Sequence, residues 1–167
     1  MRHTMNHNRA FTLPELGMAI VIGSVVVLIG WTMMVFTWRQ VYLNRVQTAA
    51  QVTAFNVVQM IEEDVMRSNL IQTPDTNYPS VPSMRVRFPA GDWRAYRLVN
   101  GDLTVQYTNA AGAPAAAYTA FSGITSLAFA PVTITNVTAG SVVRTTCTMT
   151  AANATIQVTS TAFKRNN

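Results

Sequence analysis

The sequence predicts an α+β protein in which one long N-terminal helix packs on a C-terminal antiparallel β-sheet. Three observations lead to this prediction. Residues 16–38 form an apolar run of 23 residues without a charge. A helical stripe of apolar residues follows this run. The third observation is a series of short strand-like runs beyond residue 83, two of which are joined by the hairpin dipeptide Asn100-Gly101.

The apolar run is long enough for a helix to cross a hydrocarbon layer of roughly 30 Å. Thr12 is a good N-cap, Glu15 three residues later completes a capping box, and Pro14 is tolerated in the first turn. An acidic residue at the edge of a membrane helix is nevertheless unusual, because an unpaired carboxylate in hydrocarbon costs several kcal/mol. Glu15 therefore has two compatible interpretations, a capping residue and a charge that pairs with another group.

Small residues recur on one face of the apolar helix, at Ala19, Gly23 and Gly30. Such a face lets a second helix approach closely. The alternative interpretation is that glycine is simply common in membrane helices.

The helix is expected to run to about Leu70, within an amphipathic continuation at 39–72, because no Pro or Gly occurs from 31 to 73. Apolar residues follow at helical intervals and predict a face that packs on another element; they are Leu43, Val46, Ala50, Ala54, Val57, Ile61 and Val65. Glu63 and Arg67 form an i, i+4 pair. The acidic cluster 62–64 is interpreted as a solvated face and not as a metal site.

The remainder, residues 73–167, is predicted to be β-rich. A proline-containing loop covers 73–82, and an Ala/Gly/Pro-rich loop covers 109–117. We expect one antiparallel sheet of four to seven strands on the helix. The expected strands are 84–88, 94–99, 102–107, 124–130, 132–137, 141–149 and 155–163, with turns at Asn100-Gly101, Ala139-Gly140 and 151–153.

The N-terminal stretch resembles type IV prepilins and type II secretion pseudopilins. In that family a small residue precedes Phe-Thr-Leu-x-Glu and about twenty apolar residues. Here Ala10 precedes the residues 11–15, Phe-Thr-Leu-Pro-Glu, and the apolar run follows. Two departures are Ala10 for the commoner Gly, and Pro14, where many members carry Ile or Val.

The resemblance implies a cytoplasmic leader, 1–10, that a prepilin peptidase removes between Ala10 and Phe11. It also implies methylation of Phe11, a transmembrane assembly helix at 11–38, an amphipathic continuation at 39–72 and an extracytoplasmic domain at 73–167. Glu15 would neutralise the new N-terminal amine of a neighbouring subunit. The chain would sit in the bacterial cytoplasmic membrane by a single pass, its C-terminal domain outside, and then enter a fibre through its N-terminal helix.

The β-rich part is similar to one branch of this family, the J-type pseudopilins and W-type minor pilins. The similarity lies in residues 94–98, Arg-Ala-Tyr-Arg-Leu, with the Asn-Gly-Asp-Leu that follows at 100–103, in 63–67, and in the closing segment 158–166. The resemblance is compatible with a fibre that serves secretion, motility, adhesion or DNA uptake.

Composition argues against an enzyme. The two histidines, His3 and His7, lie in the leader, so a processed chain would lack the commonest general base and metal ligand. Cys147 is the only cysteine and is expected to be a core thiol. No phosphate-binding loop or Cys/His spacing is present, so neither a cofactor nor a metal is expected. The net charge of +5 would fall to +3 without the leader, too little by itself to indicate nucleic-acid binding.

Arginines gather around two aromatic residues in the first predicted strands. Arg85, Arg87, Arg94 and Arg97 surround Trp93 and Tyr96. They could form a basic aromatic patch for single-stranded DNA. The favoured alternative is that they are solvated edge-strand residues that prevent edge pairing.

The leading hypothesis is thus a non-enzymatic minor pilin or pseudopilin that initiates or tips a fibre. The alternative is a single-pass anchored protein that never polymerises and whose outer β domain binds DNA or a protein. The motif of residues 11–15 favours the first, because a plain anchor has no reason to carry it.

Overall fold

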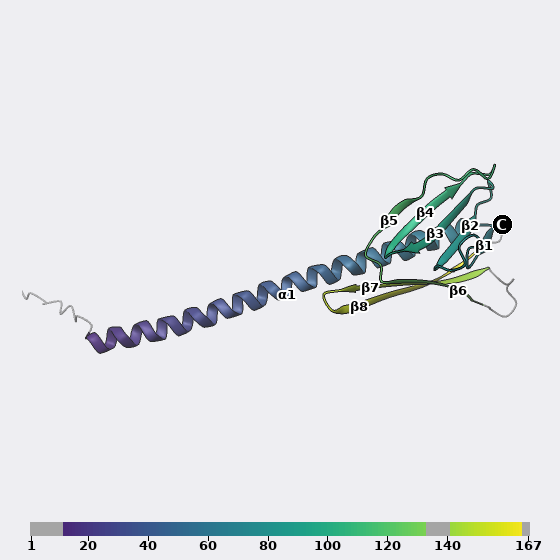
Figure 1. Ribbon diagram of the computed structural model, residues 1–167. Helices are drawn as coiled ribbons and strands as arrows, with labels where there is room; N and C mark the ends of the chain where they lie inside the picture. The colour runs from purple at the N-terminus through teal and green to yellow at the C-terminus, as the bar shows by residue number, and fades with distance from the viewer. Residues whose placement is uncertain (1–11, 133–140, 165–167) are drawn as a thin grey trace, which may run out of the picture. The chain divides into compact units, whose positions relative to one another are not determined.

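The computed structural model describes residues 12–132 and 141–164 (Figure 1). One helix, α1, runs from Leu13 to Arg67, and eight strands follow. The chain divides into two compact units, Met1–Asn44 and Arg45–Asn167, and α1 contributes to both.

The first unit consists of the N-terminal half of α1. This helix is long and apolar enough to cross a membrane, and its most apolar window is not buried against any part of the described chain. Its large side chains, such as Ile20 at 64% and Val27 at 71%, are exposed. The membrane-length helix predicted from residues 16–38 is therefore confirmed.

In the second unit, the C-terminal half of α1 is amphipathic. The predicted stripe is confirmed, because Ala50, Ala54, Val57, Ile61 and Val65 are buried, while Leu43 and Val46 near the unit boundary are partly exposed. Val58 is buried beside this stripe. Consecutive residues are rotated by about 100° about the helix axis. Because both Val57 and Val58 are buried, the buried face of α1 is wider than a single line of apolar side chains.

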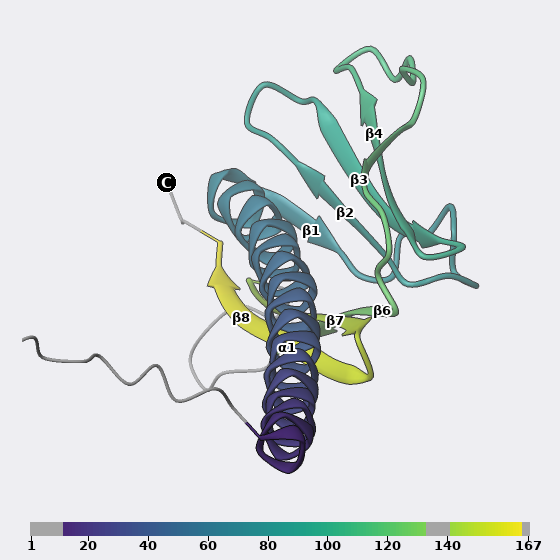
Figure 2. The ribbon, with the colours of Figure 1, turned by 90° about the vertical axis from the view of Figure 1, so that its left-hand side faces the viewer.

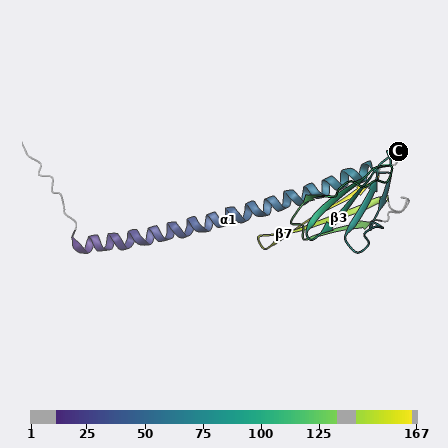
Figure 3. The ribbon, with the colours of Figure 1, turned by 45° about the horizontal axis from the view of Figure 1, so that its top comes forward.

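Two antiparallel sheets lie beside the C-terminal turns of α1 (Figures 1 and 3). The two sheets lie on different sides of these helical turns (Figure 2). Five strands form the first sheet in the order β1-β2-β3-β4-β5, and three form the second in the order β6-β7-β8. The first comprises β1 (Leu70–Gln72), β2 (Ser83–Arg87), β3 (Trp93–Val99), β4 (Asp102–Thr108) and β5 (Tyr118–Phe121). The second comprises β6 (Ser126–Pro131), β7 (Val142–Ala151) and β8 (Ala154–Phe163).

The predicted α+β layout, a long N-terminal helix with antiparallel β structure, is confirmed, but the strands form two sheets where one was expected. The wide apolar face of α1 accounts for the difference, since both sheets contribute to one core. Its largest fully buried side chains include Ile61 of the helix, Tyr96 and Leu103 of the first sheet, and Leu127 of the second. One continuous sheet on one side of the helix would leave part of this face uncovered.

The helix ends at Arg67, three residues before the expected end near Leu70. Ser68 donates backbone and side-chain hydrogen bonds to the carbonyl of Val65, and the Asn69 amide turns away to the Arg87 carbonyl at 2.8 Å. That bond begins the pairing of β1 with β2. The sequence analysis predicted β2 but missed β1 and the short strand β5.

Two predicted turns are confirmed. Asn100 and Gly101 have φ values of 52° and 85°, as a two-residue hairpin turn between β3 and β4 requires. Ala152 and Asn153 occupy the same region between β7 and β8, with φ values of 51° and 64°. The expected turn Ala139-Gly140 and all but the first residue of the expected strand 132–137 lie outside the described residues.

Cys147 lies on β7 inside the core and is fully buried, which confirms the predicted core thiol. Burial disfavours the thiolate and raises the pKa of Cys147 to about 11. A neutral thiol at this position behaves as a small apolar side chain.

Candidate functional site

The first candidate site is the start of α1. The backbone N–H and the hydroxyl of Thr12 both donate to Oε2 of Glu15, each at 2.9 Å. The Leu16 amide closes the first turn on the Thr12 carbonyl at 3.0 Å. The predicted capping contact of Glu15 is therefore observed. Both residues are exposed, so the carboxylate is accessible to a further partner.

The two residues expected at the processing site, Ala10 and Phe11, lie outside the described residues. Ala19, Gly23 and Gly30 are exposed on α1, and a Cβ built on either glycine meets no atom within 4 Å. Within the described chain this face has no neighbour. Its predicted role in helix packing stays a prediction.

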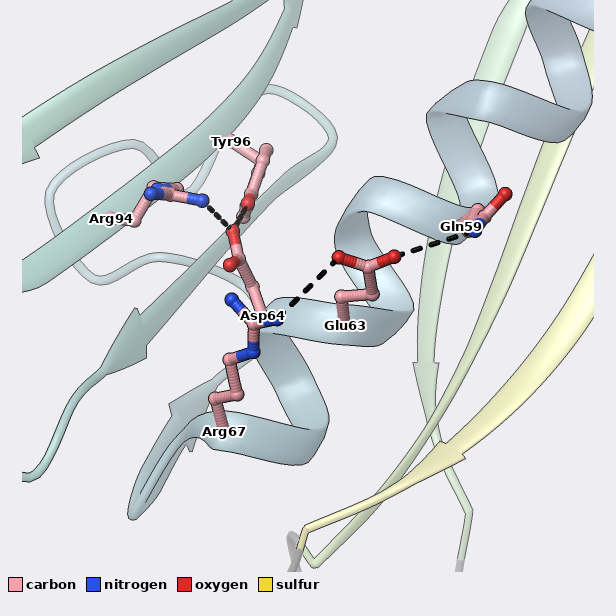
Figure 4. A network of polar contacts seen from close by, with 6 residues as sticks. All are labelled: Gln59, Glu63, Asp64, Arg67, Arg94 and Tyr96. Atoms are coloured by element: carbon pink, nitrogen blue, oxygen red, sulfur yellow. Dashed lines mark hydrogen bonds and ion pairs between the residues drawn. The ribbon is translucent and has the colours of Figure 1, made fainter.

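A second cluster joins the C-terminal half of α1 to β3. Oδ2 of Asp64 accepts hydrogen bonds from the Arg94 guanidinium and from the Tyr96 hydroxyl (Figure 4). The Asp64 residue is only 4% exposed and Tyr96 is fully buried. Burial raises the pKa of Tyr96, and the negative charge of Asp64 raises it further. The phenol therefore stays protonated and remains a donor to the carboxylate.

The interpretation of residues 62–64 as a solvated face is therefore wrong for Asp64. Only Glu63 behaves as expected, with an exposed ion pair to Arg67 at 3.9 Å and a contact to Gln59 at 3.4 Å (Figure 4). Glu62 accepts a hydrogen bond at 2.8 Å from Ser160 on β8. Asp64 follows Ile61 by three residues and lies on the buried stripe, and this spacing was the signal that the sequence offered.

The six residues of the proposed basic aromatic patch do not all lie together, because Tyr96 is buried against Asp64. On β3, Arg94 pairs with Val86 and Tyr107, on the side of the sheet that contacts α1. Its guanidinium lies over the rings of Phe88 and Tyr107, at 5.4 and 4.4 Å from their centroids, and binds Asp64. Arg94 is therefore a structural residue of the interface between helix and sheet.

The other four residues share the opposite face. The register places Arg87 directly beside Trp93, and it places Arg85 and Arg97 on the same side by alternation along β2 and β3. We call Arg85, Arg87, Trp93 and Arg97 the arginine face. The structure thus brings four of the six predicted residues together and removes Arg94 and Tyr96 from the set.

The interpretation of these arginines as edge residues is wrong. The strands that carry them, β2 and β3, are the second and third of five and have neighbours on both sides. Blunting of an open edge therefore cannot explain them.

Two residues of this face were missed from the sequence. Tyr78, in the loop before β2, lies under Arg97, with 3.9 Å from the guanidinium carbon to the ring centroid. Gln106 on β4 accepts a hydrogen bond from Arg97 at 2.9 Å. The alternation of side chains along β4 could have indicated that Gln106 lies on this face. The position of Tyr78 beside Arg97 depends on the fold of its loop, which the sequence does not indicate.

Within residues 12–132 and 141–164, no group of three or more His, Cys, Asp or Glu side chains is arranged to hold a metal ion. Comparison of the chain with models of known protein families, with curated proteins and with solved structures gives no match.

Proposed function

We propose that this chain is a structural subunit, a minor pilin or pseudopilin, of a type IV pilus or a type II secretion pseudopilus. It is inserted in the cytoplasmic membrane through α1, processed after Ala10 by a prepilin peptidase, and assembled by helix packing. The observation that carries the proposal is the motif of residues 11–15 at the start of an exposed, membrane-length helix. Its resemblance to prepilins supplies the family assignment.

The geometry at Glu15 supports an assembly role. Its carboxylate is held at the first turn by two bonds from Thr12, yet it stays exposed. A carboxylate that enters an apolar fibre core with the helix needs a positive partner, because an unpaired buried charge costs several kcal/mol. The amine that cleavage creates on a neighbouring subunit would be such a partner.

The second candidate is a non-polymerising anchored protein whose outer β domain binds a ligand. The observation that favours it is the arginine face on two interior strands, whose arginines form no ion pair with the Asp and Glu residues of the described chain. Leader processing separates the candidates, since a plain anchor would keep residues 1–10.

Intact mass spectrometry of the membrane-derived protein, with and without active prepilin peptidase, tests the proposal. We expect a chain that begins at Phe11 and carries one added methyl group only when the peptidase is active. A chain that retains residues 1–10 in peptidase-positive cells would favour the plain anchor.

Incorporation into fibres tests the role of Glu15. We expect Glu15→Ala to insert in the membrane normally but to be largely absent from sheared fibres. Thr12→Val removes only the hydroxyl bond to Glu15 and should leave incorporation nearly intact. Glu63→Ala, which removes an exposed glutamate elsewhere on α1, is the matched control. Normal incorporation of Glu15→Ala would sink the charge-pairing idea.

A further inference from the structure

Within residues 12–132 and 141–164, no carboxylate forms an ion pair with the positive charge of the arginine face. The ion pairs of the described residues join Arg67 to Glu63 and Arg94 to Asp64. All seven Asp and Glu residues of the sequence lie in the described part, and none forms an ion pair with Arg85, Arg87 or Arg97. Three arginines thus share one sheet face without a carboxylate partner. Such an arrangement repels itself and favours an anionic ligand.

An aromatic ring backs each of these guanidinium groups. Arg85 lies over Trp93 at 3.9 Å from the ring centroid, Arg87 lies 5.7 Å from the same ring, and Arg97 lies over Tyr78 at 3.9 Å. Contact with an aromatic face holds a cation in place. The side of each guanidinium away from its ring can stack on a base, and its N–H groups can donate to phosphate oxygens.

The loop that supplies Tyr78 is itself fixed. The Tyr78 amide donates to the Asp75 carbonyl at 2.9 Å, and the Tyr78 carbonyl accepts from the Ser83 hydroxyl at 2.9 Å. Asp75 is 1% exposed, and its amide donates to the same hydroxyl at 3.1 Å. The ring under Arg97 is therefore set before any ligand arrives, which lowers the ordering cost of binding.

The spacing of the arginines suits an extended chain. Arg85 and Arg87 are two residues apart on β2, about 6.6 Å along the strand. Arg97 lies on the next strand opposite Ser83, which is a further step of about 6.6 Å along β2 from Arg85. A flat sheet face with aromatic rings and arginines is a platform on which single strands bind by stacking and phosphate contacts.

We propose that the arginine face binds single-stranded nucleic acid. The backbone phosphates contact Arg85, Arg87 and Arg97, and bases stack on the outer sides of the ring-backed guanidinium groups. The inference holds for a fibre subunit and for a single-pass anchor alike, so leader processing neither supports nor refutes it.

The test uses the full chain in nanodiscs of zwitterionic lipid and the fluorescence anisotropy of a labelled oligothymidylate of roughly 20 nucleotides. The variant Arg85→Gln/Arg87→Gln removes two charges from the face. We expect at least about a tenfold loss of affinity, and a slope of log affinity against log salt that is smaller by about 1.4. Arg67→Gln/Arg144→Gln removes two exposed charges elsewhere and is the matched control, which should bind as the unaltered chain does.

A second probe, an abasic oligonucleotide of the same length and charge, isolates the stacking contribution. We expect it to bind at least about tenfold more weakly than oligothymidylate. Equal affinity for the two probes, equal loss in the two double variants, or no binding by the unaltered chain would each overturn the proposal. Equal binding to heparin or to anionic vesicles, with no preference for the base-bearing strand, would instead indicate a general anion surface and would also overturn it. Circular dichroism of each variant shows whether the fold is retained. If the Gln pair fails to fold, Arg85→Lys/Arg87→Lys provides a second test. It keeps the charge but lacks the planar guanidinium groups, so we expect it to lose the preference for oligothymidylate over the abasic probe.

Discussion

In the N-terminal half of α1, Ile20 and Ile29 are 64% and 50% exposed, whereas Ile61 in the C-terminal half is fully buried. The same residue type thus lies on one continuous helix in two opposite environments. The C-terminal half receives its burial from the strands of its own chain. The N-terminal half has no such cover within the described chain, and exposing apolar surface to water costs roughly 25 cal/mol per Å².

The polar groups of the two halves differ in the same way. Glu15 is satisfied by Thr12, three residues away in the sequence. Asp64 is satisfied by Arg94 and Tyr96, which are 30 and 32 residues away. The comparison teaches that the C-terminal half is fixed by tertiary contacts of this chain, whereas the apolar window of the N-terminal half has no such contacts within the described residues.

Among the proposed substitutions, removal of the Asp64 charge is expected to weaken the tertiary contacts of the C-terminal half of α1 most strongly. Asp64→Asn leaves the Arg94 guanidinium without its counter-charge in a mostly buried site, where loss of one partner typically costs about 3–5 kcal/mol. We expect the free energy of unfolding of the β domain, measured by urea titration of the full chain in micelles, to fall by about 3 kcal/mol.

Glu63→Gln is the matched control, since it removes the neighbouring acid from an exposed ion pair. It should change the free energy of unfolding by less than about 0.5 kcal/mol. Similar losses in both variants would mean that Asp64 does not hold the helix on β3.

Truncation of one isoleucine in each half compares their packing directly. Ile61→Ala leaves a cavity in the core and should lower the free energy of unfolding of the β domain by about 2–5 kcal/mol. Ile29→Ala removes the same atoms from an exposed position and should leave this free energy nearly unchanged. A large effect of Ile29→Ala in urea titrations of the micelle-embedded chain would show that the two halves are coupled in folding.

A pH titration tests the core that covers the C-terminal half of α1, because this core contains the titratable thiol of Cys147. Its pKa is raised to about 11 in the folded state, so the unfolded thiol loses its proton first as the pH rises. The contribution of the protonated Cys147 thiol to the free energy of unfolding is complete below pH 9. It is lost as the pH approaches 11, and the free energy of unfolding then falls by about 2–3 kcal/mol.

Cys147→Ala should remove this part of the pH dependence, whatever its effect on stability at neutral pH. The measurement is the free energy of unfolding of both chains at several values between pH 8 and 11. Parallel pH profiles for the two chains would show that the thiol does not titrate as its burial requires.

Much of the fold was predictable from local patterns. The long uncharged run and the apolar stripe with a period of 3.6 predicted α1, and Asn100-Gly101 predicted the hairpin between β3 and β4. These signals depend on neighbours in the sequence, so no tertiary information is needed to read them. The end of α1 and the strands β1 and β5 were missed because each depends on pairing with a strand elsewhere.

The candidate sites also combine features set by the local sequence with features set by long-range contacts. By itself the sequence determined an α+β chain with a membrane-length helix, a capped Glu15 and a group of arginines near Trp93, because periodicity and composition are properties of the chain. Only the tertiary structure decided that Asp64 is buried, that Arg94 belongs to the helix-facing side, and that Arg85, Arg87 and Arg97 share a face on interior strands. The physical reason is that strand register and sheet order decide which side chains meet, and both arise from long-range packing that no single segment specifies.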